Sequence, residues 1–409
     1  MQKNANEAKI SPVLTYKMLD WEKIKKDFPI FGKKPGLVFL DNASTTQKPL
    51  TVLNAEWNFY LESNANVHRG VYEIAAKADQ IYEEVRANIA EWIGAKPNEI
   101  IFTKNATEGA NLLANGFAAL LTAGDEIVVT ELEHHANYLP WMEAARRSGA
   151  VVRVAKLSDG ATVDVISEIN EKTKVVAVTQ MSNVFGMGPE LEAIVKAAKS
   201  VGAKVILDSA QGIVHAGLRV DKPGVDAAFF TGHKLFGPMG TGVLFLKNEL
   251  AGLNPLIFGG GMIKELPDQW LDAPHKFEAG TPNVAGLAGL DASIKYLRSF
   301  ELKEIVEHEK NLVKMTCDEL KKISDVRILS PENAASMVSF VMEGIHPHDI
   351  ASILGEAGVC VRAGHHCAKP LMNALGVSAC VRVSFALYNG PDDVEKLITG
   401  VKKVKEIFA

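Results

Sequence analysis

The chain has 409 residues, of which 47% are hydrophobic and 23% are charged, and its formal net charge at pH 7 is −5. This length suits one large domain plus a smaller one, and the composition is that of an ordinary globular protein. The sequence contains no basic block and no apolar run long enough to span a bilayer, so we expect no nucleic-acid or membrane partner. Four cysteines and a polar start without a secretion signal predict a cytoplasmic protein that lacks a disulfide framework.

The first 40 residues are predicted to form an N-terminal arm that packs on the smaller domain. Within this arm, 21–28 is expected to form a short helix that the next proline breaks. A strand over 37–40 is expected to end in the polar turn 41–46, which is typical of a simple capping turn. A helix over 75–92 follows, because its apolar residues recur at the spacing of one buried face.

Short runs rich in valine and isoleucine then alternate with amphipathic segments. This alternation predicts an α/β domain over 41–290, with a mostly parallel seven-stranded sheet that is covered by helices on both faces. The predicted strands are 100–103, 126–130, 151–155, 174–179, 204–208, 227–231 and 242–246, and the predicted helices are 110–121, 139–148 and 191–201. In such sheets ligands collect at the carboxyl ends of the strands, so residues there are the candidate site residues.

The alternation weakens in the C-terminal part, and 291–409 is predicted to form a smaller α+β domain. The expected elements are a long helix over about 284–323, strands near 337–342, 359–361 and 381–385, a helix near 349–356 and an amphipathic C-terminal helix.

A lysine follows the predicted strand 227–231, in the sequence Thr231-Gly232-His233-Lys234. A desolvated lysine can lose its proton near neutral pH and attack a carbonyl group. Alternatively, the side chain of Lys234 reaches back to solvent, which is the simpler explanation when this lysine is considered alone.

A carboxylate and a helix start complete a possible site around Lys234. Asp208 ends an apolar strand, where a carboxylate needs a cationic partner or good hydrogen bonds. Sequential strands usually lie near one another, so Asp208 and Lys234 are predicted to face one crevice. Thr107 marks a helix start that could bind phosphate, and it could also be an N-cap. A carboxylate for a ring nitrogen, a lysine for an aldehyde and a phosphate site together predict pyridoxal phosphate. A dinucleotide site would need a GxGxxG motif after the first strand, and the sequence has none.

Two adjacent histidines, His134 and His135, follow the predicted strand 126–130. They could bind a metal, stack on a ring or simply occupy a loop. Neighbouring side chains on an extended turn point apart, which argues against joint metal ligation. We therefore predict no metal site.

The pattern Asp208-x-x-Gln211 followed by Thr231-Gly-His-Lys234 resembles the fold-type I pyridoxal-phosphate enzymes of the class V aminotransferase group. Four further motifs narrow the resemblance to the group II, SufS-like cysteine desulfurases: Val67-His-Arg-Gly70, Glu133-His-His-Ala-Asn137, Phe277-Glu-Ala-Gly-Thr-Pro-Asn283 and Arg362-Ala-Gly-His-His-Cys-Ala368. The resemblance extends from about Leu40 to the C-terminus and implies a homodimer.

The resemblance also implies roles for individual residues. Lys234 would hold the cofactor covalently and later act as acid and base, Asp208 would pair with the ring nitrogen, Gln211 would bind the ring oxygen, and His134 would stack on the ring and could also move protons. The phosphate would be held by Thr107, Thr231, His233 and, from the other subunit, Thr281. The substrate carboxylate would be held by Asn183, which also counts among the cofactor-binding residues, and by Arg382, with Arg362 nearby and with His68 and Arg69 at the pocket mouth.

Cys367 sets the reaction that the resemblance implies. Its thiolate would attack the sulfur of cofactor-bound L-cysteine, giving L-alanine and a persulfide on Cys367. A SufE-like or SufU-like acceptor would then take the sulfur for iron–sulfur cluster assembly. The basic residues His365, His366, Arg362 and Lys369 favour the thiolate. A buried structural thiol or a metal ligand is the alternative for Cys367, but its polar neighbours and the lack of paired ligand spacing disfavour both.

Other interpretations keep the same scaffold. The substrate could be selenocysteine or cysteine sulfinate, since both need the same machinery. In a different class, the protein could be a non-catalytic thiol- or metal-binding protein. Segment 261–277 is shorter than we expect for group II enzymes, which affects the surface facing the sulfur acceptor. The alternation of Arg382 with two valines would by itself place this arginine on a solvent face, whereas the resemblance places it in the site.

Overall fold

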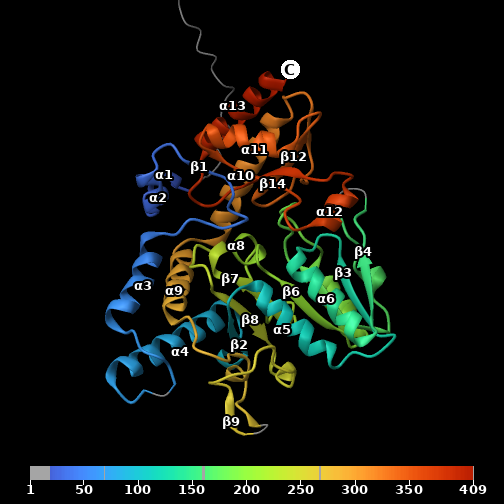
Figure 1. Ribbon diagram of the computed structural model, residues 1–409. Helices are drawn as coiled ribbons and strands as arrows, with labels where there is room; N and C mark the ends of the chain where they lie inside the picture. Colours follow the sequence, from blue (N-terminus) through green and yellow to red (C-terminus); the bar gives the residue numbers. More distant parts are fainter. Residues whose placement is uncertain (1–18, 69, 159–161, 267–268, 409) are drawn as a thin grey trace, which may run out of the picture.

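The structure is a computed structural model that describes residues 19–68, 70–158, 162–266 and 269–408. The first 18 residues of the predicted arm and Arg69 therefore lie outside the described residues. The predicted seven-stranded sheet is confirmed, in the strand order β2-β8-β7-β6-β5-β3-β4 (Figure 1). Its strands are β2 (Ile100–Thr103), β3 (Glu126–Thr130), β4 (Val151–Ala155), β5 (Thr173–Thr179), β6 (Lys204–Asp208), β7 (Ala227–Thr231) and β8 (Gly242–Leu246). Strands β7, β6, β5, β3 and β4 pair in parallel, and β8 pairs antiparallel with both of its neighbours, β2 and β7.

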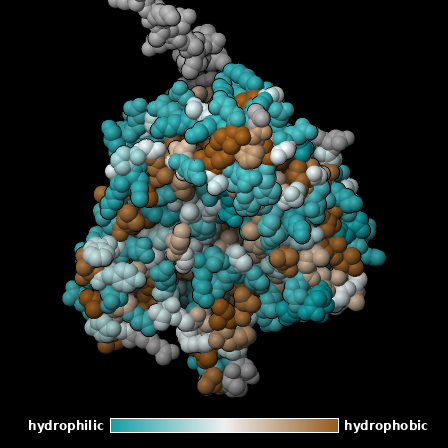
Figure 2. All heavy atoms as spheres, turned by 45° about the horizontal axis from the view of Figure 1, so that its top comes forward, coloured by the Kyte–Doolittle hydropathy of each residue, from teal (hydrophilic) through white to brown (hydrophobic). Residues whose placement is uncertain are grey.

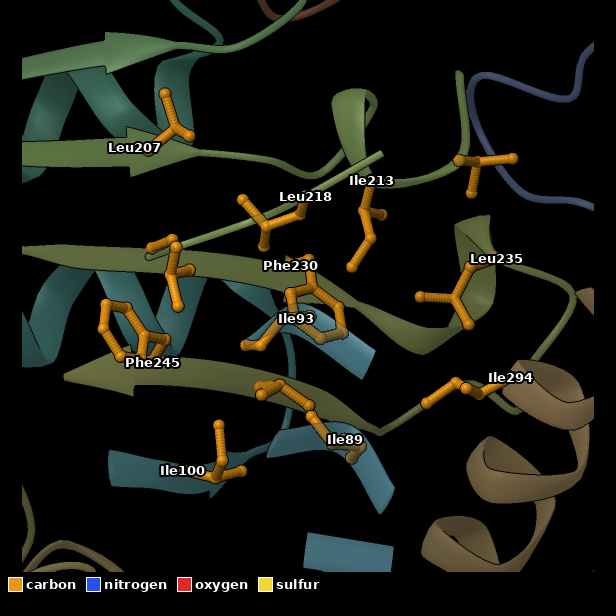
Figure 3. Packing of buried hydrophobic residues seen from close by; sticks show 14 of the residues in the cluster. Ile89, Ile93, Ile100, Leu207, Ile213, Leu218, Phe230, Leu235, Phe245 and Ile294 are labelled. Atoms are coloured by element: carbon orange, nitrogen blue, oxygen red, sulfur yellow. The ribbon is translucent and has the colours of Figure 1, made fainter. Parts of the chain in front are cut away.

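Helices cover both faces of this sheet because successive strand residues point to opposite sides. Along β7, Phe230 packs with Ile89 and Ile93 of α4 (Glu73–Ile93), as Figure 3 shows, whereas Phe229 belongs to the core on the other face. The first face also holds α7 (Leu191–Ser200), α9 (Val284–Arg298) and the short α8 (Gly212–His215). The second face holds α5 (Ala106–Ala118) and α6 (His135–Ser148). Helix α3 (Leu50–Glu62) packs on α9.

Two helices start earlier than the apolar pattern indicates. Helix α5 begins at Ala106 because the Asn105 side chain accepts a hydrogen bond of 2.9 Å from the backbone N–H of Glu108. Asn105 is therefore the N-cap, and Thr107 lies in the first turn rather than capping it. Helix α6 begins at His135, where the His134 ring accepts a hydrogen bond from the Ala136 N–H. Polar first turns hide both helix starts from a search for apolar periodicity.

The second sheet has four antiparallel strands in the order β11-β12-β15-β14. They are β11 (Val326–Ile328), β12 (Met337–Met342), β14 (Arg362–Gly364) and β15 (Cys380–Ser384). Helices α10 (Leu302–Leu320), α11 (Pro347–Glu356) and α13 (Pro391–Phe408) share one core with this sheet and lie with it at the top of Figure 1. Helix α12 (Lys369–Ala374) follows β14 after a short loop.

The predicted helix over 284–323 is two helices, α9 and α10. Helix α9 ends at Arg298, and Glu301 has an extended backbone with ψ 123° before α10 begins. The predicted domain boundary at residue 290 falls inside α9, which packs on α3 and α4. We therefore propose that the smaller domain begins after α9.

The arm also differs from its prediction in one detail. The proline at position 29 starts a helix instead of only ending one, because proline is well suited to the first helical position. The arm thus holds α1 (Trp21–Lys25) and α2 (Pro29–Lys33). Strand β1 (Val38–Phe39) pairs in parallel with β13 (Val359–Cys360), and Lys25 forms an ion pair of 3.3 Å with Asp393. These contacts support the proposal that the arm packs on the smaller domain.

The remaining elements are small. A hairpin of β9 (Ile263–Glu265) and β10 (Gln269–Trp270) projects at the bottom of Figure 1. Short 3-10 turns are η1 (Pro97–Glu99), η2 (Ile166–Glu168), η3 (Gly232–Lys234), η4 (Asn248–Leu250) and η5 (His275–Phe277). Among the helices that the structure describes, none combines the length and the apolar character needed to cross a membrane. In Figure 2, hydrophobic residues form small groups among hydrophilic ones on the visible face.

Because of two buried histidines, we expect the free energy of unfolding to decrease in mild acid. Burial lowers the pKa of His308 on α10 to about 4 and that of His366 to about 3, so both are neutral in the folded protein. Unfolded histidine takes up a proton below about pH 6.5. The unfolded state then binds more protons than the folded state, and stability falls as the pH decreases from about 6.5 toward 4, by up to about 1.4 kcal/mol per pH unit for each histidine.

Urea unfolding of the wild type and of His308→Gln, near pH 7 and near pH 5, checks this expectation. His308 Nε2 lies 2.9 Å from the Asn389 carbonyl oxygen, a contact that the glutamine amide can reproduce. The variant should lose less stability between the two pH values than the wild type. Equal losses would show that His308 does not contribute to the pH dependence.

Candidate active site

A pocket lies where the carboxyl ends of the central parallel strands meet the four-stranded sheet. The predicted site residues that line it are Thr107, His134, Asn183, Asp208, Gln211, Thr231, His233, Lys234, Arg362 and Arg382. Lining residues that we did not predict include Ser44, Asn105 and His366. Residues that are distant in sequence thus converge at the edge where sheets of this class bind their ligands.

Asp208 and Lys234 face each other across neighbouring strands. Asp208 ends β6, and Lys234 follows β7, which pairs with β6 in parallel. Burial lowers the pKa of Lys234 to about 8, although the Asp208 carboxylate opposes this shift. Burial also raises the pKa of Asp208, whose Oδ1 accepts a hydrogen bond of 2.9 Å from the Ala210 N–H. More of the Lys234 amine than of an ordinary lysine is therefore unprotonated near neutral pH, which favours its action as a nucleophile.

His134 presents a neutral ring to the pocket. Burial, followed by the charge of Lys234, lowers the pKa of His134 to about 3. Its Nδ1 accepts the Ala136 N–H at 3.1 Å, so the ring proton is on Nε2. His135 points elsewhere, because its Nε2 accepts a hydrogen bond of 3.2 Å from the Lys369 N–H. Among the described residues, no group of three or more His, Cys, Asp or Glu side chains is placed to hold a metal ion.

The start of α5 forms the anion-binding side of the pocket. Asn105, Ala106 and Thr107 line the pocket there, and the first amide groups of a helix attract negative charge. Thr231 and His233 approach from the end of β7, and burial lowers the pKa of His233 to about 4. An anion placed here therefore meets hydroxyl groups, a neutral imidazole and helix amides.

Two arginines lie side by side on the opposite wall because Arg362 of β14 is the direct partner of Arg382 in β15. Arg382 is 1% exposed, since β15 is the middle strand between β12 and β14 and is buried along its whole length. The alternation of Arg382 with valines therefore does not indicate a solvent face. Arg382 Nη1 donates to the Asn183 carbonyl at 2.9 Å, and its Nη2 donates to Asp41 Oδ1 at 3.1 Å.

Ser44 joins the two guanidinium groups. Its Oγ accepts hydrogen bonds from Arg362 Nη1 at 2.6 Å and from Arg382 Nη2 at 2.8 Å, and it donates to Asp41 Oδ1 at 2.6 Å. In the described part of the chain, Arg382 Nε and Asn183 Oδ1 are buried without a hydrogen-bond partner. Buried polar atoms are seldom left unpaired, so these two atoms identify this wall as a place where a polar ligand binds.

Cys367 lies in the loop between β14 and α12 and is partly exposed, and it is not among the residues that line the pocket. Its negative form would nevertheless raise the pKa of Lys234, which places the thiol within electrostatic reach of the amine. The loop carries two non-glycine residues in the left-handed region, His366 at φ 52° and Cys367 at φ 54°. Such conformations are costly and are often found at functional sites.

The large sheet holds this loop in place. The His135 N–H donates to the Cys367 carbonyl at 2.7 Å, and Asn183 Nδ2 donates to the His366 carbonyl at 2.8 Å. The Cys367 N–H donates to His365 Nδ1 at 3.0 Å. Burial raises the pKa of Cys317 to about 11, that of Cys380 to about 12, and also that of Cys360.

Two predicted residues lie away from this pocket within the chain. His68 donates its backbone N–H to Asp79, and its ring contacts those of Tyr82 and His275 edge-on, with centroid distances of 5.3 and 5.2 Å. Thr281 is exposed to solvent. Neither residue is among those that line the pocket.

The fold and this site define the class of protein. Residues 38–397 match the family described as aminotransferase class-V, and the chain belongs to this family. It is 44% identical to a probable cysteine desulfurase of Streptomyces coelicolor over 96% of this chain and 98% of the relative, and 42% identical to probable cysteine desulfurase 2 of Mycobacterium leprae over 95% and 98%.

This chain is also similar to solved structures of cysteine desulfurases. The cysteine desulfurase CsdA of Escherichia coli, as its S-sulfonic acid, is 35% identical with a TM-score of 0.89, covering 95% of this chain and 99% of that one. The apo cysteine desulfurase of Thermococcus onnurineus NA1 is 37% identical with a TM-score of 0.90, covering 94% and 98%.

Proposed function

We propose that the protein is a pyridoxal-phosphate-dependent cysteine desulfurase. The observation that carries this proposal is that one pocket combines Lys234 and Asp208 with two paired arginines, beside a cysteine loop that the large sheet holds in place. The similarity to cysteine desulfurases over nearly the whole chain supports the same conclusion.

The pocket fits the cofactor. Lys234 would form the covalent link to the aldehyde, Asp208 would hold the protonated ring nitrogen, and the neutral His134 would lie against the ring. Gln211 lines the same pocket, and its Nε2 donates to the Ala43 carbonyl at 2.8 Å, which fixes the orientation of an amide that would bind the ring oxygen. Thr107, Thr231 and His233 would hold the phosphate at the start of α5. When bound, pyridoxal phosphate supplies an electron sink for the substrate.

The arginine wall would hold the carboxylate of L-cysteine. Arg382 Nε is a buried donor without a partner in the described chain, and Asn183 lies next to it. Replacing Arg382 with lysine should raise KM for L-cysteine roughly 10- to 100-fold, because lysine has no Nε donor at this place and the charge-assisted contact with the carboxylate is lost. Steady-state kinetics measures the change, with Arg146→Lys as a surface control, since Arg146 is exposed and contacts Glu143. An unchanged KM would exclude Arg382 from substrate binding.

The sulfur step uses the thiol of Cys367 and balances without an added oxidant. The thiolate attacks the substrate sulfur, a new S–S bond forms, and the substrate Cβ–S bond breaks. The carbon skeleton receives a proton and leaves as L-alanine, while Cys367 keeps the sulfur as a persulfide. Lys234, which lines the same pocket, would move the protons that this step requires.

Assembly and cellular role are part of the proposal. Exposed apolar side chains on α3 and around the start of α4 are suited to the interface of a homodimer in which Thr281 reaches the partner's site. These residues are Leu50, Leu53, Trp57, Tyr60, Leu61, Val71, Tyr72 and Ile74. Sedimentation of the purified protein as a monomer would contradict this arrangement. A SufE-like or SufU-like acceptor, iron–sulfur cluster assembly and a cytoplasmic location complete the proposed role.

Product analysis tests the proposed reaction. The holoenzyme is incubated with L-cysteine, L-selenocysteine or L-cysteine sulfinate, and alanine is quantified for each. We expect alanine from L-cysteine, with sulfur retained on the protein until a reductant is added. Alanine from the other two substrates only would reassign the enzyme to selenocysteine or sulfinate chemistry, and no alanine from any substrate would contradict a catalytic function.

A further inference from the structure

The turn Thr45–Lys48 lies against the backbone that carries Lys234. The carbonyl oxygen of His233, which belongs to the peptide bond directly before Lys234, receives four donors from this turn. They are the Thr46 N–H at 3.0 Å, Thr45 Oγ1 at 3.1 Å, Lys48 Nζ at 3.1 Å and Thr46 Oγ1 at 3.2 Å. A carbonyl oxygen has two lone pairs, so this is an unusually dense set of contacts on one atom.

The same turn stops η3 from continuing as a helix. In a longer helix, backbone N–H groups after Lys234 would satisfy the His233 carbonyl. Instead, the Phe236 N–H donates to Thr46 Oγ1 at 2.9 Å, and Phe236 adopts a left-handed backbone with φ 66°. The backbone geometry of Lys234 is therefore set by a segment that lies more than 180 residues earlier in the chain.

Lys48 is an unusual member of this turn. Its ammonium group donates to the Thr46 and His233 carbonyls, and burial lowers its pKa to about 8. Among the described residues, no carboxylate lies within ion-pair distance of it. A partly buried cation whose partners are only neutral oxygens is costly, so a structural link alone does not explain it well. A few residues earlier, Ser44 holds the two arginines of the pocket.

We propose that Lys48 is a positioning residue which, together with Thr45 and Thr46, fixes the peptide bond before Lys234 and so directs the Lys234 amine into the pocket. This inference rests on the proposed function, in which Lys234 carries the cofactor. Ser44, which contacts Arg362 and Arg382, belongs to the same stretch of chain. The turn therefore also keeps Lys234 in a fixed position relative to the two arginines that would bind the substrate carboxylate.

The test compares Lys48→Met with the conservative Lys48→Arg and with Lys276→Met. Lys276 is a matched control, because it is also a partly buried lysine with a lowered pKa that donates to a backbone carbonyl, that of Ala251 at 3.1 Å. It does not line the pocket around Lys234. Pyridoxal phosphate is added to the apoprotein, and absorbance follows the rate of covalent attachment to Lys234. Steady-state kinetics with L-cysteine is measured in parallel.

We expect Lys48→Met to slow covalent attachment and to lower kcat roughly 10- to 100-fold, the effect of a small misplacement of a reacting group, with KM for L-cysteine little changed. Lys48→Arg should recover most of both rates, and Lys276→Met should behave as the wild type. If Lys48→Met does not fold, Thr46→Val removes two contacts of the same turn and should slow attachment similarly. Wild-type rates in the folded Lys48→Met or Thr46→Val protein would overturn the inference. A wild-type protein that never attaches the cofactor would contradict the proposed function itself.

Discussion

Replacing Lys234 with alanine should abolish the turnover of L-cysteine, with a loss of at least about 10,000-fold, because one side chain supplies both the covalent anchor and the proton transfers. The side chain lines the pocket rather than filling an apolar core, so its removal should leave the fold intact. Alanine production measures the loss, and circular dichroism checks the fold. Lys276→Ala is the control for the removal of a partly buried lysine.

The colour of the protein gives a second measurement on the same variant. Borohydride should fix the cofactor to the wild-type chain at Lys234, so that it survives denaturation. In Lys234→Ala the cofactor should be released on denaturation, with or without borohydride. A yellow variant that still retains its cofactor covalently would contradict the assignment of Lys234.

Replacing Cys367 with alanine should lower turnover of L-cysteine at least about 1,000-fold, because the variant lacks the nucleophile that receives the sulfur. Covalent attachment of the cofactor to Lys234 should remain, since Cys367 does not line the pocket. Alanine production from L-cysteine is the measurement, and Cys360→Ala is the matched control, because Cys360 is also a partly exposed free cysteine.

The activity of Cys367→Ala with different substrates distinguishes between the possible roles of Cys367. Full activity of Cys367→Ala with L-cysteine would refute the persulfide mechanism. Activity retained only with selenocysteine would fit a weaker carbon–selenium bond that needs no nucleophile, and it would leave the sulfur step assigned to Cys367.

The strands of the large sheet were predictable from sequence because each is a short, mostly apolar run, and most of them are buried. The start of α5 was not, because it depends on a side-chain cap by Asn105 rather than on apolar spacing. Asp208 and Lys234 could be paired in advance because sequential strands of a parallel sheet are often neighbours. The contact of Ser44 with Arg382 joins residues 338 positions apart, and no local pattern encodes it.

The pairing of Arg362 with Arg382 on the other wall of the pocket could not be predicted from local sequence either. Two arginines 20 positions apart become direct neighbours only through the antiparallel register of β14 and β15. The burial of Arg382 depends on β15 being a middle strand that is covered on both faces, which local alternation does not reveal. Lys48 was equally hidden, because its partner carbonyl belongs to the turn that carries Lys234.

Mass spectrometry of the peptide that contains Cys367 tests the central claim most directly. The holoenzyme is treated with L-cysteine without reductant, and the thiols are then blocked. The account predicts the mass of at least one added sulfur atom on Cys367 in the wild type, and none in Lys234→Ala. Alanine formation with sulfur found only on Cys317, Cys360 or Cys380, or on no cysteine at all, would contradict it.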